Sequence, residues 1–211
     1  MQIDQQDGDT LARMGGWLFK RRTSIPLPIA LALLLIPAPP HVTSFWTPLT
    51  LAGVLAIAAG ELMRIWGVQH IGAISRTRSD RLGPLIDTGP FSLVRNPLYL
   101  GNILLWIGFT LAAQLLWLAP VVAVLLSLEY HAIVRWEEQL LDLRLGEPYR
   151  VYQRQVPRWM PRVGAPKQLA GAGRFTLLDT LVSERGTLIA IAIGLLLLAA
   201  KQQATSGHWI R

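Results

Sequence analysis

Residues 98–128 read LYLGNILLWIGFTLAAQLLWLAPVVAVLLSL, and this apolar stretch decides the fold. No Asp, Glu, Lys or Arg lies between Asn96 and Leu128. As one helix the stretch would be about 46 Å long at about 1.5 Å per residue, well beyond a hydrocarbon core of about 30 Å. We therefore predict a helical hairpin that turns near Trp117 to Pro120.

Further apolar stretches flank this hairpin. The region from Thr23 to Gly60 also lacks charged residues, and it predicts a first span over Thr23–Pro37 and a second over Trp46–Val68. Another apolar run, Thr187–Ala200, is short for a span and is either a fifth helix or a peripheral one. Hydrophobic residues make up 52% of the chain and charged residues 16%, against about 25% charged in soluble domains. The expected fold is all-α, a polytopic membrane helical protein with about five transmembrane helices.

The basic residues are distributed as the positive-inside rule requires. The formal net charge of +7 raises the possibility of nucleic-acid binding, but the arginines lie at the ends of apolar stretches. They gather at Lys20–Arg22, Ile71–Arg95 and Arg135–Arg174, whereas the turns at Pro37–Pro48 and Ala113–Pro120 contain no Asp, Glu, Lys or Arg. Cytoplasmic loops are rich in Lys and Arg. We expect no nucleic-acid partner, and an integral protein of a bacterial inner membrane whose active site faces the cytoplasm.

The chain divides into three parts. We expect a cytoplasmic N-terminal segment at 1–22, a membrane-embedded core at 23–163, and a linker with a C-terminal apolar helix at 164–211. The run Ile25–Ile36 is followed by prolines and no small-residue cleavage site, so it is interpreted as a retained span. There are no cysteines, and the four histidines do not stand at ligand spacing, so we predict no metal site.

The chemistry must come from two polar segments that the hairpin joins. The first is Gly83–Gly101, GPLIDTGPFSLVRNPLYLG. The second comprises Arg135–Glu138 (RWEE), Leu145–Tyr152 (LGEPYRVY) and Val156–Arg158 (VPR). Glycine-rich nucleotide loops, hydrolase elbows and zinc-protease motifs are missing from the chain. Gly146 predicts a helix end, and Glu147-Pro148 predicts the start of a short helix.

These segments resemble the superfamily of isoprenylcysteine carboxyl methyltransferases and phospholipid methyltransferases. That family combines Gly-Pro-aromatic, Arg-His-Pro-x-Tyr-x-Gly, a helical hairpin, Glu-Glu, Phe-Gly-x-x-Tyr-x-x-Tyr and Val-Pro in this order. The resemblance covers roughly residues 61–161. It implies an integral membrane methyltransferase core with a cytoplasmic pocket for S-adenosylmethionine. It also implies a set of cofactor-binding residues: Gly83, Pro84, Leu85, Ile86, Phe91, Asn96, Pro97, Leu98, Tyr99 and Glu137.

The residue chemistry is compatible with that assignment. A guanidinium from Arg95 or Arg135 is suited to the cofactor carboxylate, because it donates two parallel hydrogen bonds. Glu137 or Glu138 is suited to the ammonium or the ribose hydroxyls. We name Arg95 as a cofactor-binding candidate, and Arg135 and Glu138 as catalytic candidates, with Glu138 as a possible base.

Each of these residues also has a structural interpretation. Phe91 and Tyr99 are alternatively interface aromatics, and the carboxylates of Glu137 and Glu138 are alternatively a solvated face. Tyr149 and Tyr152 are interpreted as packing residues. Glu61 and Arg64 are interpreted as an interfacial ion pair. Four further basic residues are interpreted as topology determinants near lipid headgroups: Arg158, Arg162, Lys167 and Arg174.

Two positions depart from the family pattern. Asn96 stands where the family most often has His, so a titrating group is lost there. The prenylcysteine enzymes carry a substrate-binding Arg at the position of Ile133, and Arg135 points to a different helix face. This departure argues against a prenylcysteine carboxylate as the substrate.

The predicted function is methyl transfer from S-adenosylmethionine to a lipophilic acceptor, a carboxylate, amine or thiol, that enters from the bilayer. Positioning of the acceptor behind the methyl group supplies most of the acceleration in such a displacement. Two alternatives remain open: a non-catalytic membrane scaffold or assembly protein, and a membrane reductase of the sterol-reductase type, against which the short chain counts. Membrane lipids are expected contacts, and the oligomeric state is open.

Overall fold

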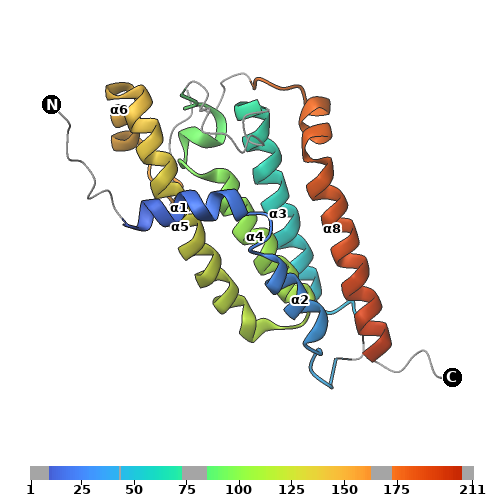
Figure 1. Cartoon of the computed structure of the whole chain (residues 1–211). Helices are drawn as coiled ribbons and strands as arrows, with labels where there is room; N and C mark the ends of the chain where they lie inside the picture. Colours follow the sequence, from blue (N-terminus) through green and yellow to red (C-terminus); the bar gives the residue numbers. More distant parts are fainter. Residues whose placement is uncertain (1–9, 43, 73–84, 163–172, 206–211) are drawn as a thin grey trace.

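A computed structural model describes residues 10–42, 44–72, 85–162 and 173–205 (Figure 1). Within these ranges the secondary structure is helical and contains no strand. The helices are α1 (Thr10–Arg21), α2 (Leu27–Leu35), α3 (Pro48–Ile71), α4 (Pro97–Ala112), α5 (Ala119–Leu145), α6 (Glu147–Gln155) and α8 (Leu177–Thr205), with short 3₁₀ turns η2 (Gly89–Ser92) and η3 (Leu116–Leu118). The predicted all-α class is confirmed.

Three helical stretches are long and apolar enough to cross a membrane: Pro48–Ile71, Leu116–Leu145 and Leu177–Thr205. Helix α4 is apolar but shorter. The polytopic membrane fold is therefore confirmed, whereas the count of about five spans stays a prediction. Helix α2 has only 9 residues, about 14 Å at about 1.5 Å per residue, so it is shorter than the first span predicted over Thr23–Pro37.

The predicted hairpin is confirmed as α4, η3 and α5. Gln114 lies in its turn and has a left-handed backbone conformation with φ of 65°. The side-chain amide of Gln114 donates to the hydroxyls of Thr47 and Thr50, both at 2.6 Å. Thr47 also caps α3 by accepting from the backbone N–H of Thr50 at 3.1 Å. These bonds attach the hairpin turn to the start of α3.

Helices α3 and α4 approach closely because glycines face each other along their contact. A Cβ added at Gly60 would lie 2.6 Å from the carbonyl oxygen of Gly101, and one at Gly108 would lie 2.6 Å from that of Gly53. Small residues at such contacts allow membrane helices to pack backbone to backbone. Gly101 therefore packs its backbone directly against α3.

The last apolar run is longer than the sequence interpretation allowed. Helix α8 has 29 residues and is about 43 Å long at about 1.5 Å per residue, so of the two alternatives for Thr187–Ala200 the structure favours a fifth helix long enough to span. The helix continues through polar residues because they are paired inside the bundle. Glu184 accepts a hydrogen bond from Arg64 at 2.6 Å, and Thr187 lies 3.3 Å from the same guanidinium.

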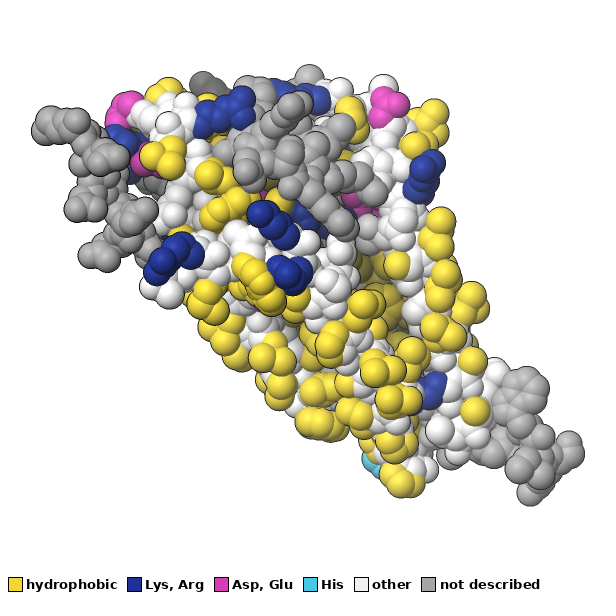
Figure 2. All heavy atoms as spheres, viewed as in Figure 1, with side chains coloured by type: hydrophobic (Ala, Val, Ile, Leu, Met, Phe, Trp, Pro, Cys, Tyr) yellow, Lys and Arg dark blue, Asp and Glu magenta, His cyan; other side chains and the backbone are white. Residues whose placement is uncertain are grey.

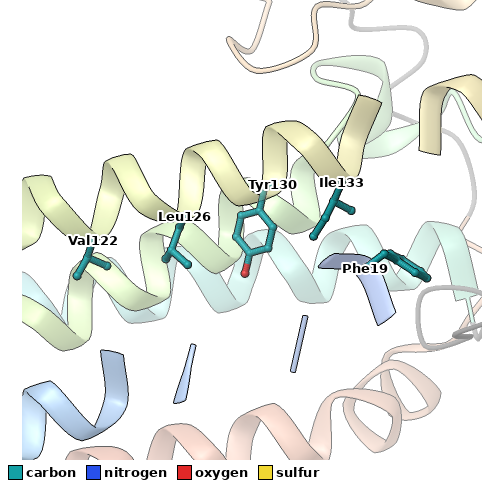
Figure 3. Packing of buried hydrophobic residues seen from close by; sticks show 5 residues of the cluster. All are labelled: Phe19, Val122, Leu126, Tyr130 and Ile133. Atoms are coloured by element: carbon teal, nitrogen blue, oxygen red, sulfur yellow. The ribbon is translucent and has the colours of Figure 1, made fainter. Parts of the chain in front are cut away.

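Helix α1 is amphipathic and lies across α5 (Figure 1). Its Phe19 joins Val122, Leu126, Tyr130 and Ile133 in one buried cluster (Figure 3). On the face drawn in Figure 2, hydrophobic side chains cover the middle and lower parts, and Lys and Arg gather toward the upper end. That end is where α6 lies in Figure 1, so the basic surface and the predicted site share one end of the bundle.

Candidate functional site

The candidate site lies where the start of α4, the end of α5 and the chain after α6 meet. Helix α5 ends at Gly146, whose φ of 60° is in the left-handed region, and α6 begins at the next residue. This turn confirms the helix break predicted at Gly146 and the short helix predicted from Glu147. It brings residues 156–162 back against the segment that precedes α4.

Backbone hydrogen bonds join the two polar segments. The N–H of Arg95 donates to the carbonyl of Pro157 at 2.9 Å, and the N–H of Arg162 donates to that of Leu93 at 3.0 Å. The side-chain amide of Asn96 donates to the carbonyl of Arg158 at 3.1 Å. Asn96 thus holds the two segments together through its amide.

Glu138 is the centre of a buried ion-pair group. Arg95 donates to one of its oxygens at 2.7 Å, and Arg158 donates to both, at 3.1 Å and 2.6 Å. Its side chain is only 9% exposed. The guanidinium of Arg158 is therefore committed to Glu138, and the hydrogen bond raises the pKa of Arg158 above its ordinary value.

This geometry corrects the interpretation of Arg158 and Arg162 as residues that only determine topology. Arg162 donates from its side chain to the carbonyls of Ser92 at 2.9 Å and Gln155 at 2.8 Å. Both arginines connect the chain after α6 to the rest of the site. The sequence offered one signal for this role, since both arginines closely follow the Val-Pro motif at Val156.

Glu137 faces a different group from its neighbour. Its carboxylate accepts a hydrogen bond from the phenol of Tyr99 at 3.0 Å. The ring of Tyr99 packs against that of Tyr130, with centroids 4.9 Å apart. Adjacent carboxylates on α5 thus lie in separate surroundings, one beside two tyrosines and one between two arginines.

The other aromatic and apolar candidates lie on the α6 side of the site. Leu85 packs with Tyr149, Tyr152 and Val156, and the phenol of Tyr152 donates to the carbonyl of Phe91 at 2.8 Å. Burial raises the pKa of Tyr149 to about 12 and also raises the pKa of Tyr152. Both phenols are therefore neutral at physiological pH, which agrees with their interpretation as packing residues.

A small pocket of about 80 Å³ opens on this side, lined by Leu85, Asp87, Pro148, Val151, Tyr152, Gln155, Val156 and Arg162. Ligand pockets usually measure about 300–1,000 Å³, so this pocket alone is too small for S-adenosylmethionine. Gly83 and Pro84, predicted to line the cofactor site, lie outside the described residues.

The remaining candidates occupy the same end of the bundle. Ile86 is half-buried just before η2. Pro97 begins α4 and is buried, and Leu98 packs where a Cβ on Gly67 of α3 would lie. Arg135 is half-buried on α5. Ile133, where the family's arginine is missing, is fully buried in the cluster with Phe19.

Sequence reasoning missed the extent of the Arg64 network. The sequence suggested an interfacial ion pair with Glu61, and the pair is present at 3.4 Å. In addition, Arg64 donates to Asn102 of α4 at 2.6 Å and to Glu184 of α8 at 2.6 Å. Its side chain is 15% exposed. Arg64 thus links three helices below the candidate site.

Comparison with known proteins finds a family model that matches part of this chain. A family model described as phospholipid methyltransferase matches residues 49–147. This match contains α3, α4, α5, Tyr99 and both carboxylates, Glu137 and Glu138. It confirms the resemblance predicted from the polar segments.

Two curated relatives carry names that refer to metal resistance. The nickel-cobalt-cadmium resistance protein NccN of Alcaligenes xylosoxydans xylosoxydans is 30% identical over 111 residues, 53% of this chain and 49% of the relative. The cobalt-zinc-cadmium resistance protein CzcN of Cupriavidus metallidurans is 30% identical over 118 residues, 56% of this chain and 51% of the relative. The chain spans about half the length of the curated relatives it matches. No solved structure matches it.

Proposed function

We propose that this protein transfers a methyl group from S-adenosylmethionine to a lipophilic acceptor, because residues 49–147 match a family model described as phospholipid methyltransferase. The reaction occurs at the end of the bundle where α4 begins and α5 ends. The acceptor offers a carboxylate, an amine or a thiol. The membrane is a bacterial inner membrane, and the site faces the cytoplasm.

The main support for the proposal is that two adjacent carboxylates at one end of the apolar helices have different partners. Glu137 is hydrogen-bonded to the neutral phenol donor of Tyr99, and this leaves its charge uncompensated by any salt bridge within the described residues. Glu138 is neutralised by two arginines. One carboxylate is thus suited to bind a cationic ligand, and the other to hold the walls of the site together.

The residues present fit the proposed cofactor. S-adenosylmethionine, when bound, supplies a methyl group activated by a sulfonium, and it also carries an ammonium, a carboxylate and an adenine. Glu137 would bind the ammonium. The buried Nε–H of Arg95 donates to no hydrogen-bond acceptor among the described residues, so it is available to an acceptor on the ligand. The predicted adenine contacts are Leu85, Phe91 and Tyr99.

The acceptor must be placed behind the methyl group with water excluded. The site lies at the ends of the apolar helices α4 and α5. A lipophilic acceptor can therefore reach it from the bilayer. Both oxygens of Glu138 already accept hydrogen bonds from Arg95 and Arg158. If Glu138 acts as a base, one of these bonds must open first, so positioning is the main contribution that we assign to this site.

The names of the relatives suggest a physiological setting. Both relatives are named for resistance to cobalt and cadmium, so we propose that the methylated product supports survival under metal stress. The described residues contain no group of three or more metal-binding side chains. The scaffold and the reductase are the rival functions.

The test is calorimetric titration of the detergent-purified protein with S-adenosylhomocysteine. We expect saturable binding near the micromolar range and its loss in Glu137→Gln, because the amide cannot pair with the ammonium. Glu147→Gln is the matched control, since Glu147 forms an exposed ion pair with Arg154 on α6 and should bind normally.

Each other result decides between the rivals. Folded wild-type protein that does not bind would refute the proposal in favour of the scaffold. Binding of a nicotinamide cofactor in its place would support the reductase. Normal binding by Glu137→Gln would retain the cofactor and refute the assigned role of Glu137.

A further inference from the structure

Arg22 is a basic residue outside the family match that reaches the Glu137 side of the site. It follows α1, and its guanidinium lies over the ring of Phe19, 4.0 Å from the centroid. The residue is half-buried. It forms no salt bridge with the part of the chain that the structure describes.

Phe19 connects Arg22 to the end of α5. Its ring packs against that of Trp136, with centroids 4.9 Å apart, and Trp136 directly precedes Glu137. Tyr99 belongs to the same hydrophobic cluster as Phe19, and Figure 3 shows Phe19 beside Tyr130 and Ile133. The cation–π contact therefore holds the guanidinium at the seam between α1 and α5, beside the Tyr99–Glu137 hydrogen bond.

The charge of Arg22 acts on both members of that pair. Electrostatic interactions connect it to Glu137 and to Tyr99. Yet no nitrogen of Arg22 lies within 4.0 Å of the Glu137 carboxylate. Opposite charges that interact without forming a salt bridge suit a ligand with one charge of each sign.

Two other arginines at this end of the bundle are committed elsewhere. Arg95 and Arg158 both pair with Glu138. Arg22 is instead positioned by an aromatic ring, which leaves its donors available for an anion.

We propose that Arg22 binds the carboxylate at the amino-acid end of S-adenosylmethionine while Glu137 binds its ammonium. The inference rests on the proposed function and adds to it a residue from the N-terminal helix. The segment that follows helix α1 thus contributes part of the cofactor site, which residues 49–147 of the family match do not form alone.

The test compares two ligands that differ only in this carboxylate. S-adenosylmethionine and decarboxylated S-adenosylmethionine are titrated without acceptor into wild-type protein, Arg22→Gln and Arg21→Gln. The last variant is a matched control, because Arg21 also lies over an aromatic ring, that of Trp17 at 4.3 Å, and its side chain is exposed.

We expect Arg22→Gln to bind S-adenosylmethionine about 10- to 100-fold more weakly, the range for a hydrogen bond between charged groups. It should bind the decarboxylated ligand as wild type does, and Arg21→Gln should bind both normally. Arg22→Lys keeps the charge without the forked geometry, so an intermediate loss is expected. This variant provides the same comparison if Arg22→Gln does not fold.

Three results would overturn the inference. Equal weakening of both ligands would give Arg22 a structural role only. Unchanged affinity for S-adenosylmethionine, with or without a raised KM for the acceptor, would remove Arg22 from the cofactor site and leave the proposed function intact. Wild-type protein that binds neither ligand would overturn the inference and the proposed function together.

Discussion

The phenol of Tyr99, on the first turn of α4, donates a hydrogen bond of 3.0 Å to the carboxylate of Glu137 near the end of α5. The two residues are 38 positions apart in the chain, and the hairpin turn at the opposite end of the bundle brings them together. The hairpin therefore has a direct role in the site, because its length sets which residues of α4 and α5 face each other.

Removing this phenol should weaken cofactor binding without unfolding the protein. In Tyr99→Phe the Glu137 carboxylate loses its oriented donor, and a hydrogen bond to a charged group contributes about 1.5–3 kcal/mol. We expect affinity for S-adenosylhomocysteine to fall roughly tenfold or more. Isothermal titration calorimetry measures this change.

Tyr130→Phe is the control for the loss of a phenol from this stack. Its ring packs on Tyr99, but its hydroxyl has no hydrogen bond to Glu137 in the described structure. Equal losses in the two variants would mean that general disturbance of the aromatic stack, and not the Tyr99–Glu137 bond, sets the affinity.

The helical hairpin and the break at Gly146 were predictable from the sequence because local signals determine them. An uncharged run longer than the bilayer is thick fits within the membrane when it turns back on itself. A glycine followed by Glu-Pro ends one helix and begins the next. The distribution of basic residues also put the polar segments before and after the hairpin on the same side of the membrane. The backbone bond from Arg95 to Pro157 is in agreement with this.

Pairing over long distances along the chain was not predictable in the same way. Arg158 was interpreted from its charge alone, and its partner Glu138 lies 20 residues earlier. The extent of α8 was missed because Glu184 is unfavourable in an apolar run unless it is paired, and its partner Arg64 lies 120 residues away. Single-sequence patterns contain no information on such partners.

Glu138 should contribute to stability far more than an exposed carboxylate does. Glu138→Gln leaves Arg95 and Arg158 without their counter-charge inside the protein, and breaking a buried ion pair costs about 3–5 kcal/mol. We expect a clear fall in the thermal unfolding temperature in detergent. Glu147→Gln removes an exposed pair with Arg154 and should change stability little, as is usual for surface pairs.

Comparable unfolding temperatures for these two variants would contradict the burial of the Glu138 group. High salt should not lower the unfolding temperature of the wild type to that of Glu138→Gln, since salt screens exposed pairs much more than buried ones. Such a fall in high salt would also contradict the burial of the group.

The glycine contact between α3 and α4 should tolerate no added methyl group. Gly60→Ala and Gly108→Ala each place a Cβ within 2.6 Å of a carbonyl oxygen on the facing helix. Overpacking of this kind typically costs about 1–3 kcal/mol. Fluorescence-detected size exclusion after heating would measure the loss of folded protein.

Gly186→Ala on α8 is the control for a glycine in a helix without a close contact. A Cβ at Gly186 meets nothing within 4 Å, and alanine is the better helix former. Its stability should equal or exceed that of the wild type. Unaffected stability of Gly60→Ala would show that α3 and α4 are farther apart than the structure has them.

The side of the membrane on which the site lies can be measured directly, because the chain has no cysteine. A single cysteine at Arg144, exposed at the end of α5, reports on the site end, and one at Trp117, exposed in η3, reports on the hairpin turn. In intact spheroplasts a membrane-impermeant maleimide should label Trp117→Cys only. Permeabilisation should then expose Arg144→Cys, because arginine-rich ends stay on the cytoplasmic side. The reverse labelling pattern would place Glu137 and Glu138 on the outer face, where S-adenosylmethionine made in the cytoplasm does not reach them, and would refute methyl transfer at this site.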